Sequence, residues 1–411
     1  MMTHVIIGAG AAGISAAKTI RKLDAKADII MVSVDDQVHS RCMLHKYLSH
    51  ERAESSLSFI PADFFETFGI TWLKSREAVH IDSKKQTVLL DDGTELSFDR
   101  LLIATGAHSV IPPIPNLREA KNVFGLRDLS DAKQIRKLAQ TADKILVLGS
   151  GLVGMDAAYA FLEQKKDVTV LELADRILPK QLDEKAGKTY QNLFEQHGCK
   201  FILGRKAVLT TMPENDLITS VMLDDGTILE CDMIVVAAGV RPAADCTEDC
   251  EIAVDRFIKV NEYLETNCSN IYAAGDVNGI AAIWPNAMKQ GHTAACNMCG
   301  VPTPYEDTYG MKNTMNFYGL TTLSIGDGIV KDGDQVLSQE DSNCYKKAIL
   351  RNGRLQSILI QGPIDYSGIY QYLIKNQVSL ESINTDVFLL SFADFYGTDF
   401  RGQYTYTINA K

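Results

Sequence analysis

The chain has 411 residues, of which 46% are hydrophobic and 23% are charged, a balance typical of globular proteins. Its 41 Lys and Arg residues against 52 Asp and Glu residues give a net charge of -11. An acidic surface disfavours nucleic acid and anionic lipid, because both are polyanions. We therefore expect no nucleic-acid or membrane partner, and a prior of about 150 residues per domain predicts two or three domains.

The cellular location is predicted from what the chain lacks. Residues 1–8 run into an apolar strand without a basic leader, and residues 233–240, one of the longest apolar runs, are far shorter than a bilayer span of roughly 20 residues. Nine scattered cysteines favour reduced thiols over a disulfide framework. These features predict a cytoplasmic protein. The CxxC of Cys296 and Cys299 has no second CxxC or His pair, so no metal site is predicted.

A strand, a glycine-rich turn and an Ala-rich helix open the chain at residues 5–20, and a second strand follows at residues 28–34. The turn has the spacing GxGxxG and is formed by Gly8, Ala9, Gly10, Ala11, Ala12 and Gly13. At this spacing the first glycine permits a tight turn, and the second lets a pyrophosphate approach the backbone. The third brings helix and strand together, so that the helix N-terminus faces the phosphates. The segment predicts a dinucleotide site.

The same order of elements occurs a second time. A hairpin with its turn at Asp92-Gly93 and an apolar strand ending in Ala104, Thr105 and Gly106 complete the first copy. The second copy, residues 145–239, has Gly149, Ser150, Gly151, Leu152, Val153 and Gly154 in its turn, a hairpin turn at Asp225-Gly226, and Ala238-Gly239 after its last strand. Alternating strands and helices predict parallel sheets with right-handed crossovers. The predicted fold class is α/β, with two Rossmann-like domains that carry antiparallel β insertions.

The residue after the second strand of each copy decides the ribose contact. Glu172 ends that strand in the second copy, and its carboxylate would bond the ribose hydroxyls and repel a 2′-phosphate. This predicts a preference for NADH over NADPH, and the positive charge of Arg176, one turn away, would partly offset that preference. In the first copy Ser33 stands at the equivalent place, and the nearest acid is Asp35.

Residues 306–411 have no dinucleotide motif. Residues 344–360 alternate through a turn at Asn352-Gly353, which predicts a small α+β C-terminal domain. Aromatic residues gather near the end, and core or interface packing is the favoured role for them. They leave a homodimer open as an alternative. These residues are Phe388, Phe392, Phe395, Tyr396, Phe400, Tyr404 and Tyr406.

A third motif completes the pattern. Residues 266–276 form an apolar strand that ends in Gly275-Asp276, and Trp284-Pro285 then begin a helix. The two turns and this motif, in this order, resemble the pyridine nucleotide–disulfide oxidoreductase superfamily. The resemblance extends from residue 2 to about 300.

The resemblance implies FAD at the first site and NAD(H) at the second. It implies a discontinuous FAD domain of residues 1–112 and 243–305, an inserted NAD(H) domain of residues 113–242, and a C-terminal domain of residues 306–411. The late strand is expected to join the first sheet, with Asp276 holding the ribityl chain. The residues expected at FAD are Gly8, Gly10, Ala11, Ala12, Gly13, Ser33, Asp35, Ser40, Arg41, Cys42, Ala104, Thr105, Gly106, Gly275, Asp276, Trp284 and Pro285. Those expected at NAD(H) are Gly149, Gly151, Leu152, Val153, Gly154, Glu172, Arg176, Ala238 and Gly239.

Residues 38–48 decide the branch of the superfamily. No CxxxxC pair occurs, which excludes the disulfide reductases that use one. Residues 40–44 are more similar to NADH:rubredoxin reductases and nitrite reductase flavin modules than to NADH oxidases or CoA-disulfide reductases. Cys42 is either a redox centre beside the flavin or a small residue that lines its pocket, and the second interpretation is slightly favoured. Arg41 is expected to contact FAD phosphate or reduced flavin. Leu152 stands where many relatives place a Tyr gate.

The leading prediction is an FAD-dependent NADH oxidoreductase that delivers electrons to a carrier protein such as rubredoxin or ferredoxin, or to a partner metalloenzyme. The first alternative is an NADH oxidase or disulfide reductase that uses Cys42. The second, of a different class, is an FAD-binding electron-transfer subunit beside iron–sulfur subunits.

Overall fold

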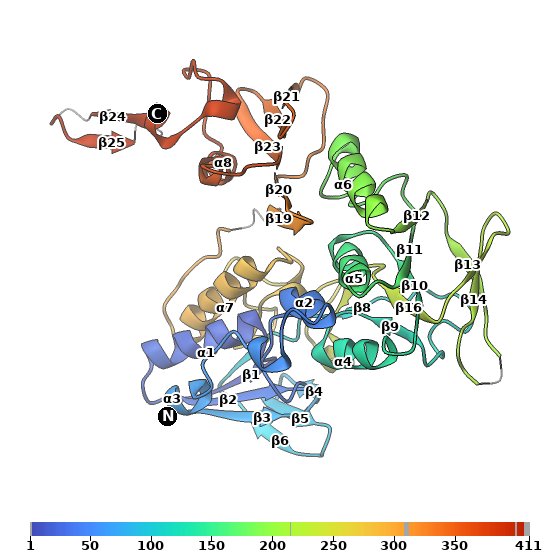
Figure 1. Ribbon diagram of the computed structural model, residues 1–411. Coiled ribbons are helices and arrows are strands. Elements are labelled where there is room, and N and C mark those ends of the chain that lie inside the picture. Colours follow the sequence, from blue (N-terminus) through green and yellow to red (C-terminus); the bar gives the residue numbers. More distant parts are fainter. Residues whose placement is uncertain (1, 214, 308–311, 399–400, 407–411) are drawn as a thin grey trace. The chain divides into compact units, whose positions relative to one another are not determined.

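The protein forms two compact units that are built from interleaved parts of the chain. This computed structural model describes residues 2–213, 215–307, 312–398 and 401–406 (Figure 1). The first unit holds residues 1–173 and 198–310, and the second holds residues 174–197 and 311–411. Among the described residues, no helix is long and apolar enough to cross a membrane.

A parallel five-stranded sheet lies at the centre of the N-terminal segment. Its order is β18-β7-β1-β2-β3, and its strands are β1 (Thr3–Ile7), β2 (Asp28–Ser33), β3 (Ile70–Lys74), β7 (Arg100–Ile103) and β18 (Ile271–Ala273). The late strand β18 pairs with β7, which confirms that the motif before Asp276 joins this sheet. Helices α1 (Ala11–Leu23) and α7 (Trp284–Met298) pack against each other on one face.

The second face of this sheet is covered by an antiparallel sheet. Its strands are β4 (Ala78–Asp82), β5 (Thr87–Leu90) and β6 (Glu95–Ser97), and the turn between the last two is the predicted Asp-Gly turn. Short elements complete this part of the unit: η1 (Arg41–Met43), α2 (Leu44–Leu48), η2 (Glu54–Ser56), α3 (Phe64–Thr67), β8 (Ala107–Ser109), β17 (Val240–Pro242), η3 (Asp245–Thr247) and η4 (Asp276–Asn278).

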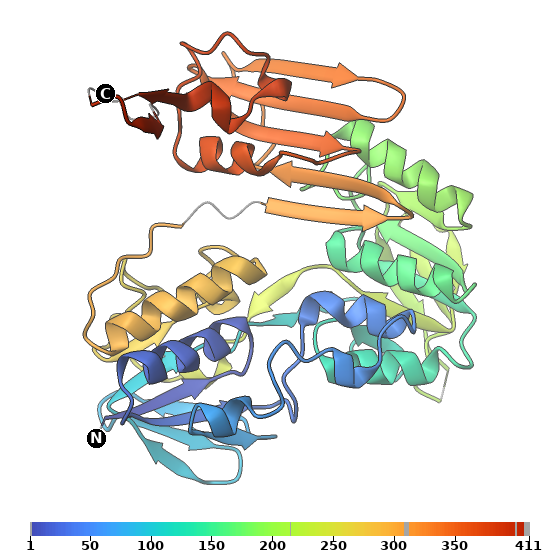
Figure 2. The same ribbon diagram turned by 60° about the vertical axis from the view of Figure 1, so that its left-hand side comes forward.

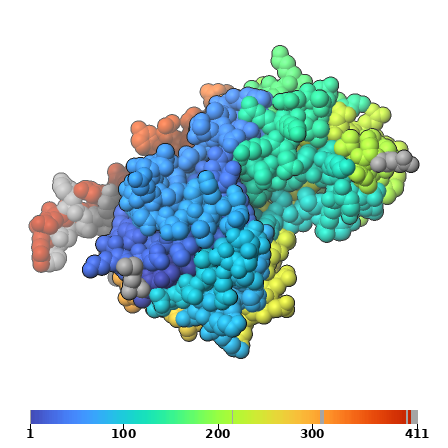
Figure 3. Space-filling view, turned by 90° about the horizontal axis from the view of Figure 1, so that it is seen from below, coloured from blue at the N-terminus to red at the C-terminus, as the bar shows by residue number. Residues whose placement is uncertain are grey.

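A second parallel sheet repeats the arrangement in the same unit. Its order is β12-β11-β10-β16-β9, and its strands are β9 (Val123–Gly125), β10 (Lys144–Leu148), β11 (Asp167–Glu172), β12 (Lys200–Leu203) and β16 (Met233–Val236). With it occur helices α4 (Leu129–Leu138) and α5 (Leu152–Glu163), and a sheet of β13 (Ala207–Thr211), β14 (Ser220–Leu223) and β15 (Ile228–Glu230). The two parts are in contact: the Gln164 Nε2 donates to the Leu48 carbonyl oxygen at 2.9 Å. Figure 3 shows the blue N-terminal segment against the green one that follows it.

An antiparallel sheet forms the core of the second compact unit, called the C-terminal unit below (Figure 2). Its order is β19-β20-β23-β22-β21, and its strands are β19 (Lys312–Phe317), β20 (Leu320–Ile325), β21 (Gln335–Glu340), β22 (Tyr345–Arg351) and β23 (Arg354–Gln361). Helix α8 (Gly368–Lys375) packs on one face. Helix α6 (Glu184–Gln196) adjoins the strands through the Tyr190 hydroxyl, which donates to the Leu320 carbonyl oxygen at 2.7 Å. The predicted α+β character of this region is confirmed.

The aromatic residues near the end have different environments. Phe388 and Phe395 are buried in the core beside α8, whereas Phe392 and Tyr396 are exposed. They belong to η5 (Val387–Leu389), η6 (Phe392–Phe395) and β24 (Tyr396–Thr398), and β24 pairs with β25 (Tyr404–Tyr406). Phe400 and the side chains of Tyr404 and Tyr406 lie outside the described residues. The predicted domain boundaries stay a prediction, because the first compact unit holds both parallel sheets.

Candidate functional site

The first and third glycines of each GxGxxG turn are required by packing inside the protein. Gly8 has φ +112°, and a Cβ on it would lie 2.2 Å from the Ala104 carbonyl oxygen. A Cβ on Gly13 would lie 1.9 Å from the Gly8 carbonyl oxygen, so helix α1 can approach β1 only without a side chain there. The second turn repeats this geometry, with Gly149 at φ +105° and a Cβ on Gly154 only 2.0 Å from the Gly149 oxygen.

The second glycine of each turn has a different reason to lack a side chain. A Cβ on Gly10 or on Gly151 would meet no atom of the protein within 4 Å. These residues are the N-caps of α1 and α5, and neither helix has a side-chain cap. The space and the uncapped N–H groups therefore fit an external anion such as a dinucleotide pyrophosphate. The residues present thus fit FAD at the first turn and NAD(H) at the second.

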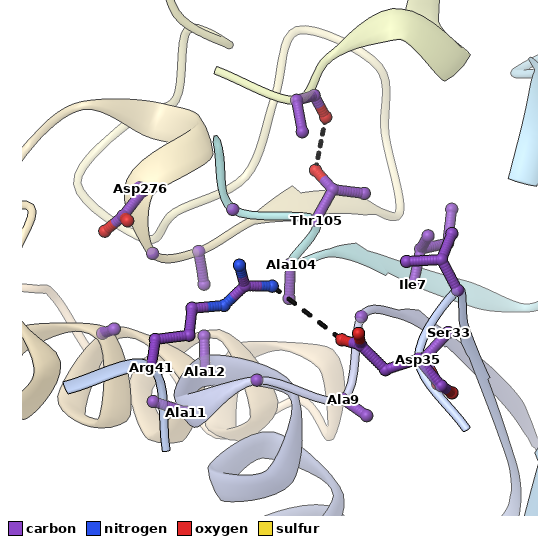
Figure 4. Close-up of a pocket in the computed structure, with 18 of the residues that line it drawn as sticks. Ile7, Ala9, Ala11, Ala12, Ser33, Asp35, Arg41, Ala104, Thr105 and Asp276 are labelled. Atoms are coloured by element: carbon purple, nitrogen blue, oxygen red, sulfur yellow. Dashed lines mark hydrogen bonds and ion pairs between the residues drawn. The ribbon is translucent and has the colours of Figure 1, made fainter. Parts of the chain in front are cut away.

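One pocket brings most of the predicted FAD residues together at the carboxyl ends of β1, β2, β7 and β18 (Figure 4). Ligands of open α/β sheets bind at this edge. The predicted residues that line it are Gly8, Gly10, Ala11, Ala12, Ser33, Asp35, Arg41, Cys42, Ala104, Thr105, Gly106, Gly275, Asp276 and Trp284. Gly13, Ser40 and Pro285 do not line it.

Ser33, which stands at the ribose position, is already hydrogen-bonded within the protein. Its hydroxyl donates to the Asp35 carbonyl oxygen at 2.9 Å and accepts from the Trp72 Nε1 at 2.9 Å. The Asp35 carboxylate faces the pocket, and burial raises the pKa of this carboxyl above its usual value. Asp35 is therefore the better candidate for a ribose contact in the first unit.

The carboxylate predicted to hold the ribityl chain is positioned by a glycine turn and by an arginine that is distant in the sequence. Gly275 has φ +85° and places Asp276 at the pocket directly after β18. The Arg127 Nη2 donates to the Asp276 Oδ2 at 2.5 Å, and the Arg127 Nε donates to the Ala107 carbonyl oxygen at 3.2 Å. Arg127 lines the pocket and was not predicted from the sequence.

Arg41 lies between carboxylates from two segments of the first unit. Its guanidinium pairs with Asp128, and its Nη2 lies 3.9 Å from the Asp35 Oδ2 (Figure 4). The Arg41 Nη1 also donates to the Arg127 carbonyl oxygen at 3.2 Å. The neighbouring residues Arg127 and Asp128 thus contact two of the three charged residues expected at FAD, Asp276 and Arg41. The one sequence signal was the capping box of Asp128 and Asp131 at the start of α4.

A carboxylate cluster at this position could be mistaken for a metal site. Ligand atoms of Asp35, His39 and Asp128 all lie within 4.8 Å of one another. Arg41 pairs with both carboxylates, however, so a metal ion would compete with a guanidinium that is already in place. We therefore assign these carboxylates to Arg41. His39 is buried and does not line the pocket.

Cys42 is the middle residue of η1, and this exposed residue lines the pocket. Partial desolvation by the surrounding protein raises the pKa of the Cys42 thiol above its usual value, and the Asp156 carboxylate adds to the rise. A thiolate nucleophile requires the opposite shift, which positive neighbours normally supply. In this structure the thiol form is favoured, as expected for a residue that only lines the pocket.

A histidine–carboxylate pair lies close to Cys42, and the sequence analysis missed its second member. The His45 Nδ1 on α2 lies 3.5 Å from the Asp156 Oδ2 on α5. Burial lowers the pKa of His45 to about 4 and raises the pKa of Asp156 to about 7, with Lys46 opposing the second effect. The pair can therefore hold a proton on the carboxyl near neutral pH. Its only sequence signal was an acid two residues after Gly154.

The second dinucleotide turn orients its own ribose acid. The backbone N–H and the hydroxyl of Ser150 donate to the Glu172 Oε2 at 2.7 and 2.8 Å. Leu152 and Val153 begin α5, and Ala238 and Gly239 follow β16, with Gly239 at φ +114°. Arg176 belongs to the C-terminal unit, where its Nη1 contacts Asp175 and its Nη2 donates to the Pro179 carbonyl oxygen at 3.3 Å. The predicted NAD(H) contacts stay predictions.

Comparison with known proteins now decides the family. Residues 2–291 match the family model described as pyridine nucleotide-disulphide oxidoreductase. The chain belongs to this family. Family membership confirms the predicted resemblance, the oxidoreductase class, and FAD and NAD(H) as cofactors.

This pyridine nucleotide–disulphide oxidoreductase is similar to two curated proteins and to one solved structure. It is 30% identical to the assimilatory nitrate reductase electron transfer subunit of Bacillus subtilis (strain 168), covering 87% of this chain and 47% of that protein. It is 27% identical to the NADH-dependent phenylglyoxylate dehydrogenase subunit epsilon of Aromatoleum evansii, covering 93% of each. The chain spans about half the length of the first of these relatives. The structure of the covalent putidaredoxin reductase–putidaredoxin complex matches with a TM-score of 0.82 at 24% identity, covering 92% of this chain and 94% of that one, which confirms the fold.

Proposed function

We propose that this oxidoreductase takes a hydride from NADH and delivers the electrons to a one-electron acceptor, either a carrier protein or an iron–sulfur partner subunit. Bound FAD accepts two electrons together and releases them singly, as such an acceptor requires. The observation that carries the proposal is the state of Cys42: its thiol faces the pocket, and its pKa is raised. A route through a thiolate is therefore disfavoured, which leaves direct delivery from the cofactor.

The residues of the chain supply binding and proton handling. Glu172, held by Ser150, accepts hydrogen bonds from the NADH ribose and disfavours NADPH. Asp276 and Arg41 bind the sugar chain and phosphates of the flavin nucleotide. The pair of His45 and Asp156 holds the proton that must be taken up or released when the redox state changes.

Relatives of known function support an acceptor that is a protein. One similar protein is named as an electron transfer subunit, and another is named as a subunit of an NADH-dependent dehydrogenase and has the same extent as this chain. In the proposed location, the cytoplasm, the nine cysteines stay reduced; all are free thiols in the structure.

The test is an anaerobic titration of the FAD-loaded protein with NADH, followed in the visible spectrum, for the wild type and for Cys42→Ser. We expect one equivalent of NADH to bleach the flavin without long-wavelength charge-transfer absorbance, and Cys42→Ser to keep its turnover with a one-electron acceptor. Cys344→Ser, in the C-terminal unit, is the matched control. Consumption of a second equivalent, lost in Cys42→Ser alone, would refute the proposal.

The second candidate is an NADH oxidase or a disulfide reductase that uses Cys42. The observation in its favour is the exposure of this thiol to the pocket. Such an enzyme would convert a disulfide, NADH and a proton into two thiols and NAD⁺. The same titration separates the candidates, because Cys42 in an oxidised form, as a sulfenic acid or a mixed disulfide, would consume a second equivalent of NADH.

The third candidate is an electron-transfer subunit that turns over NADH only within a larger complex. The 93% mutual coverage with a dehydrogenase subunit favours it. Purification from the native host with iron–sulfur subunits attached, together with slow turnover of the isolated chain, would support it over a free reductase.

A further inference from the structure

A pocket in the C-terminal unit is separate from the FAD pocket, and of its lining residues only Arg176 is among those expected at NAD(H). Its cavity volume is about 340 Å³, enough for a small molecule. The floor is one face of the sheet, where strand pairing aligns Ser324, Leu359 and Lys347 in one row and Ser357 with Ile349 in the next. The loop of residues 176–184 forms a wall.

Polar groups that line this pocket have no hydrogen-bond partner in the protein. Ser324 and Ser357 are only 7% and 5% exposed, and no hydrogen bond of either hydroxyl occurs among the described residues. The Arg176 Nε and the Gln181 Oε1 are buried and also lack a partner there. A buried polar group without a partner is costly, so the Arg176 Nε and the Gln181 Oε1, together with two serine hydroxyls that the protein does not bond, indicate an external partner.

The opposite face of the sheet is packed with hydrophobic side chains. Residues 323, 325, 348, 350, 358 and 360 alternate with the pocket residues, and all are hydrophobic and packed with α8. On the pocket face, Ser324 and Ser357 are buried together with two further polar residues, Thr322 and Gln361. Packing alone does not explain hydroxyls at these positions.

The unpartnered groups of the pocket suit an oxyanion. Three of the four unpartnered groups are donors: the two hydroxyls and the Arg176 Nε–H. Lys347 also lines the pocket and donates to the Asp183 Oδ2 at 3.1 Å, which leaves it further N–H groups. The acidic residues Asp183, Glu184 and Asp327 line the pocket too, and the Asp183 carboxylate is bonded by Lys347, by Tyr345 and by the α6 backbone at Ala186.

We propose that this pocket binds a small anionic molecule through a carboxylate or a phosphate group. Ser324, Ser357 and Arg176 donate to its oxygens, and Gln181 accepts from a hydroxyl or amino group of the same ligand. The proposal is independent of the electron acceptor and of Cys42.

Calorimetric titration of the full, FAD-loaded chain tests it, with inorganic phosphate in one arm and malonate in the other. Saturating NAD⁺ occupies the second dinucleotide turn, so that its helix N-terminus does not take up the probe. We expect one site per chain for at least one probe, and the arm that saturates identifies the group. Ser324→Ala/Ser357→Ala should weaken binding at least tenfold. Ser338→Ala, an exposed serine of β21, should leave it unchanged.

A second variant keeps the test independent of the serines. Gln181→Glu places a carboxylate where it can pair with Arg176, and it should prevent binding of either probe. Thermal unfolding and the flavin spectrum show whether each variant is folded. Absence of saturable binding in both arms, or equal affinity in the wild type and both folded variants, would overturn the proposal.

Discussion

Replacing Glu172 by Gln tests whether this carboxylate selects NADH. Its Oε2 accepts two hydrogen bonds from Ser150, at 2.7 and 2.8 Å, so the carboxylate is fixed before any ribose arrives. The substitution keeps the size of the side chain, removes its charge and replaces one acceptor oxygen by an NH2 donor. Bonds to charged groups contribute about 1.5–3 kcal/mol, against about 0.5–1.5 kcal/mol for neutral ones. The loss is therefore about 1–1.5 kcal/mol, or roughly five- to thirteenfold.

The assay is steady-state reduction of an artificial acceptor by NADH and by NADPH. We expect kcat/KM for NADH to fall by the factor above through KM, because the ribose contact is remote from the reacting carbon, while kcat/KM for NADPH rises. Glu163→Gln is the control: it removes an exposed carboxylate at the end of α5 and should change neither value. An unchanged ratio of the two kcat/KM values in Glu172→Gln would refute the assignment of Glu172 to the ribose.

Three further predictions concern the glycine-rich turn, the proton pair and acid stability. Gly151→Ala should leave the melting temperature unchanged but weaken NADH binding. Gly154→Ala should lower the melting temperature, because its Cβ would lie 2.0 Å from a backbone oxygen. Thermal unfolding and NADH titration of both variants test this prediction. The pKa of Asp156 is raised to about 7, so this carboxyl is protonated below that pH. The pH–rate profile should therefore contain a limb near pH 7 that Asp156→Asn abolishes. An unchanged profile in the variant would exclude Asp156 as the group that holds the proton. Burial lowers the pKa of His4 from 6.5 to about 4, so the unfolded chain binds the proton first and stability is lost as the pH falls below 6.5. Between pH 7 and pH 5 we expect about 2 kcal/mol of loss from this group, absent in His4→Leu, in denaturant unfolding at both pH values.

The repeated units were predictable because their signals are local. A glycine-rich turn, the strand before it and the helix after it lie within about twenty residues, and an Asp-Gly turn defines a hairpin by itself. Gly8 and Gly149 have the positive φ that such turns require. The strand before Asp276 is distant in sequence but was recognisable from its own motif, and it pairs with β7 as expected.

The polar partners of the site were not predictable, because they are decided by tertiary packing. Arg127 lies 149 residues from Asp276, and no spacing rule connects them. Burial of Asp156 beside His45 depends on how α2 and α5 meet. Likewise, only the structure shows that the Ser33 hydroxyl is bonded to Trp72, which leaves Asp35 as the ribose candidate.

The two glycine-rich turns share their backbone geometry and differ in the polar residues around them, and this difference fits two cofactors with different residence times. At the first turn, Arg41 and Arg127 pair with carboxylates around a pocket. These charges are already partly desolvated, so a flavin nucleotide that binds there would replace contacts within the protein by its own contacts. At the second turn, Ser150 fixes the Glu172 carboxylate that is expected at the ribose. Few contacts permit fast release, as a consumed substrate such as NADH requires, whereas the enclosed set favours a cofactor that stays. We therefore expect the same backbone turn to retain one cofactor and to exchange the other, with the surrounding side chains making the difference.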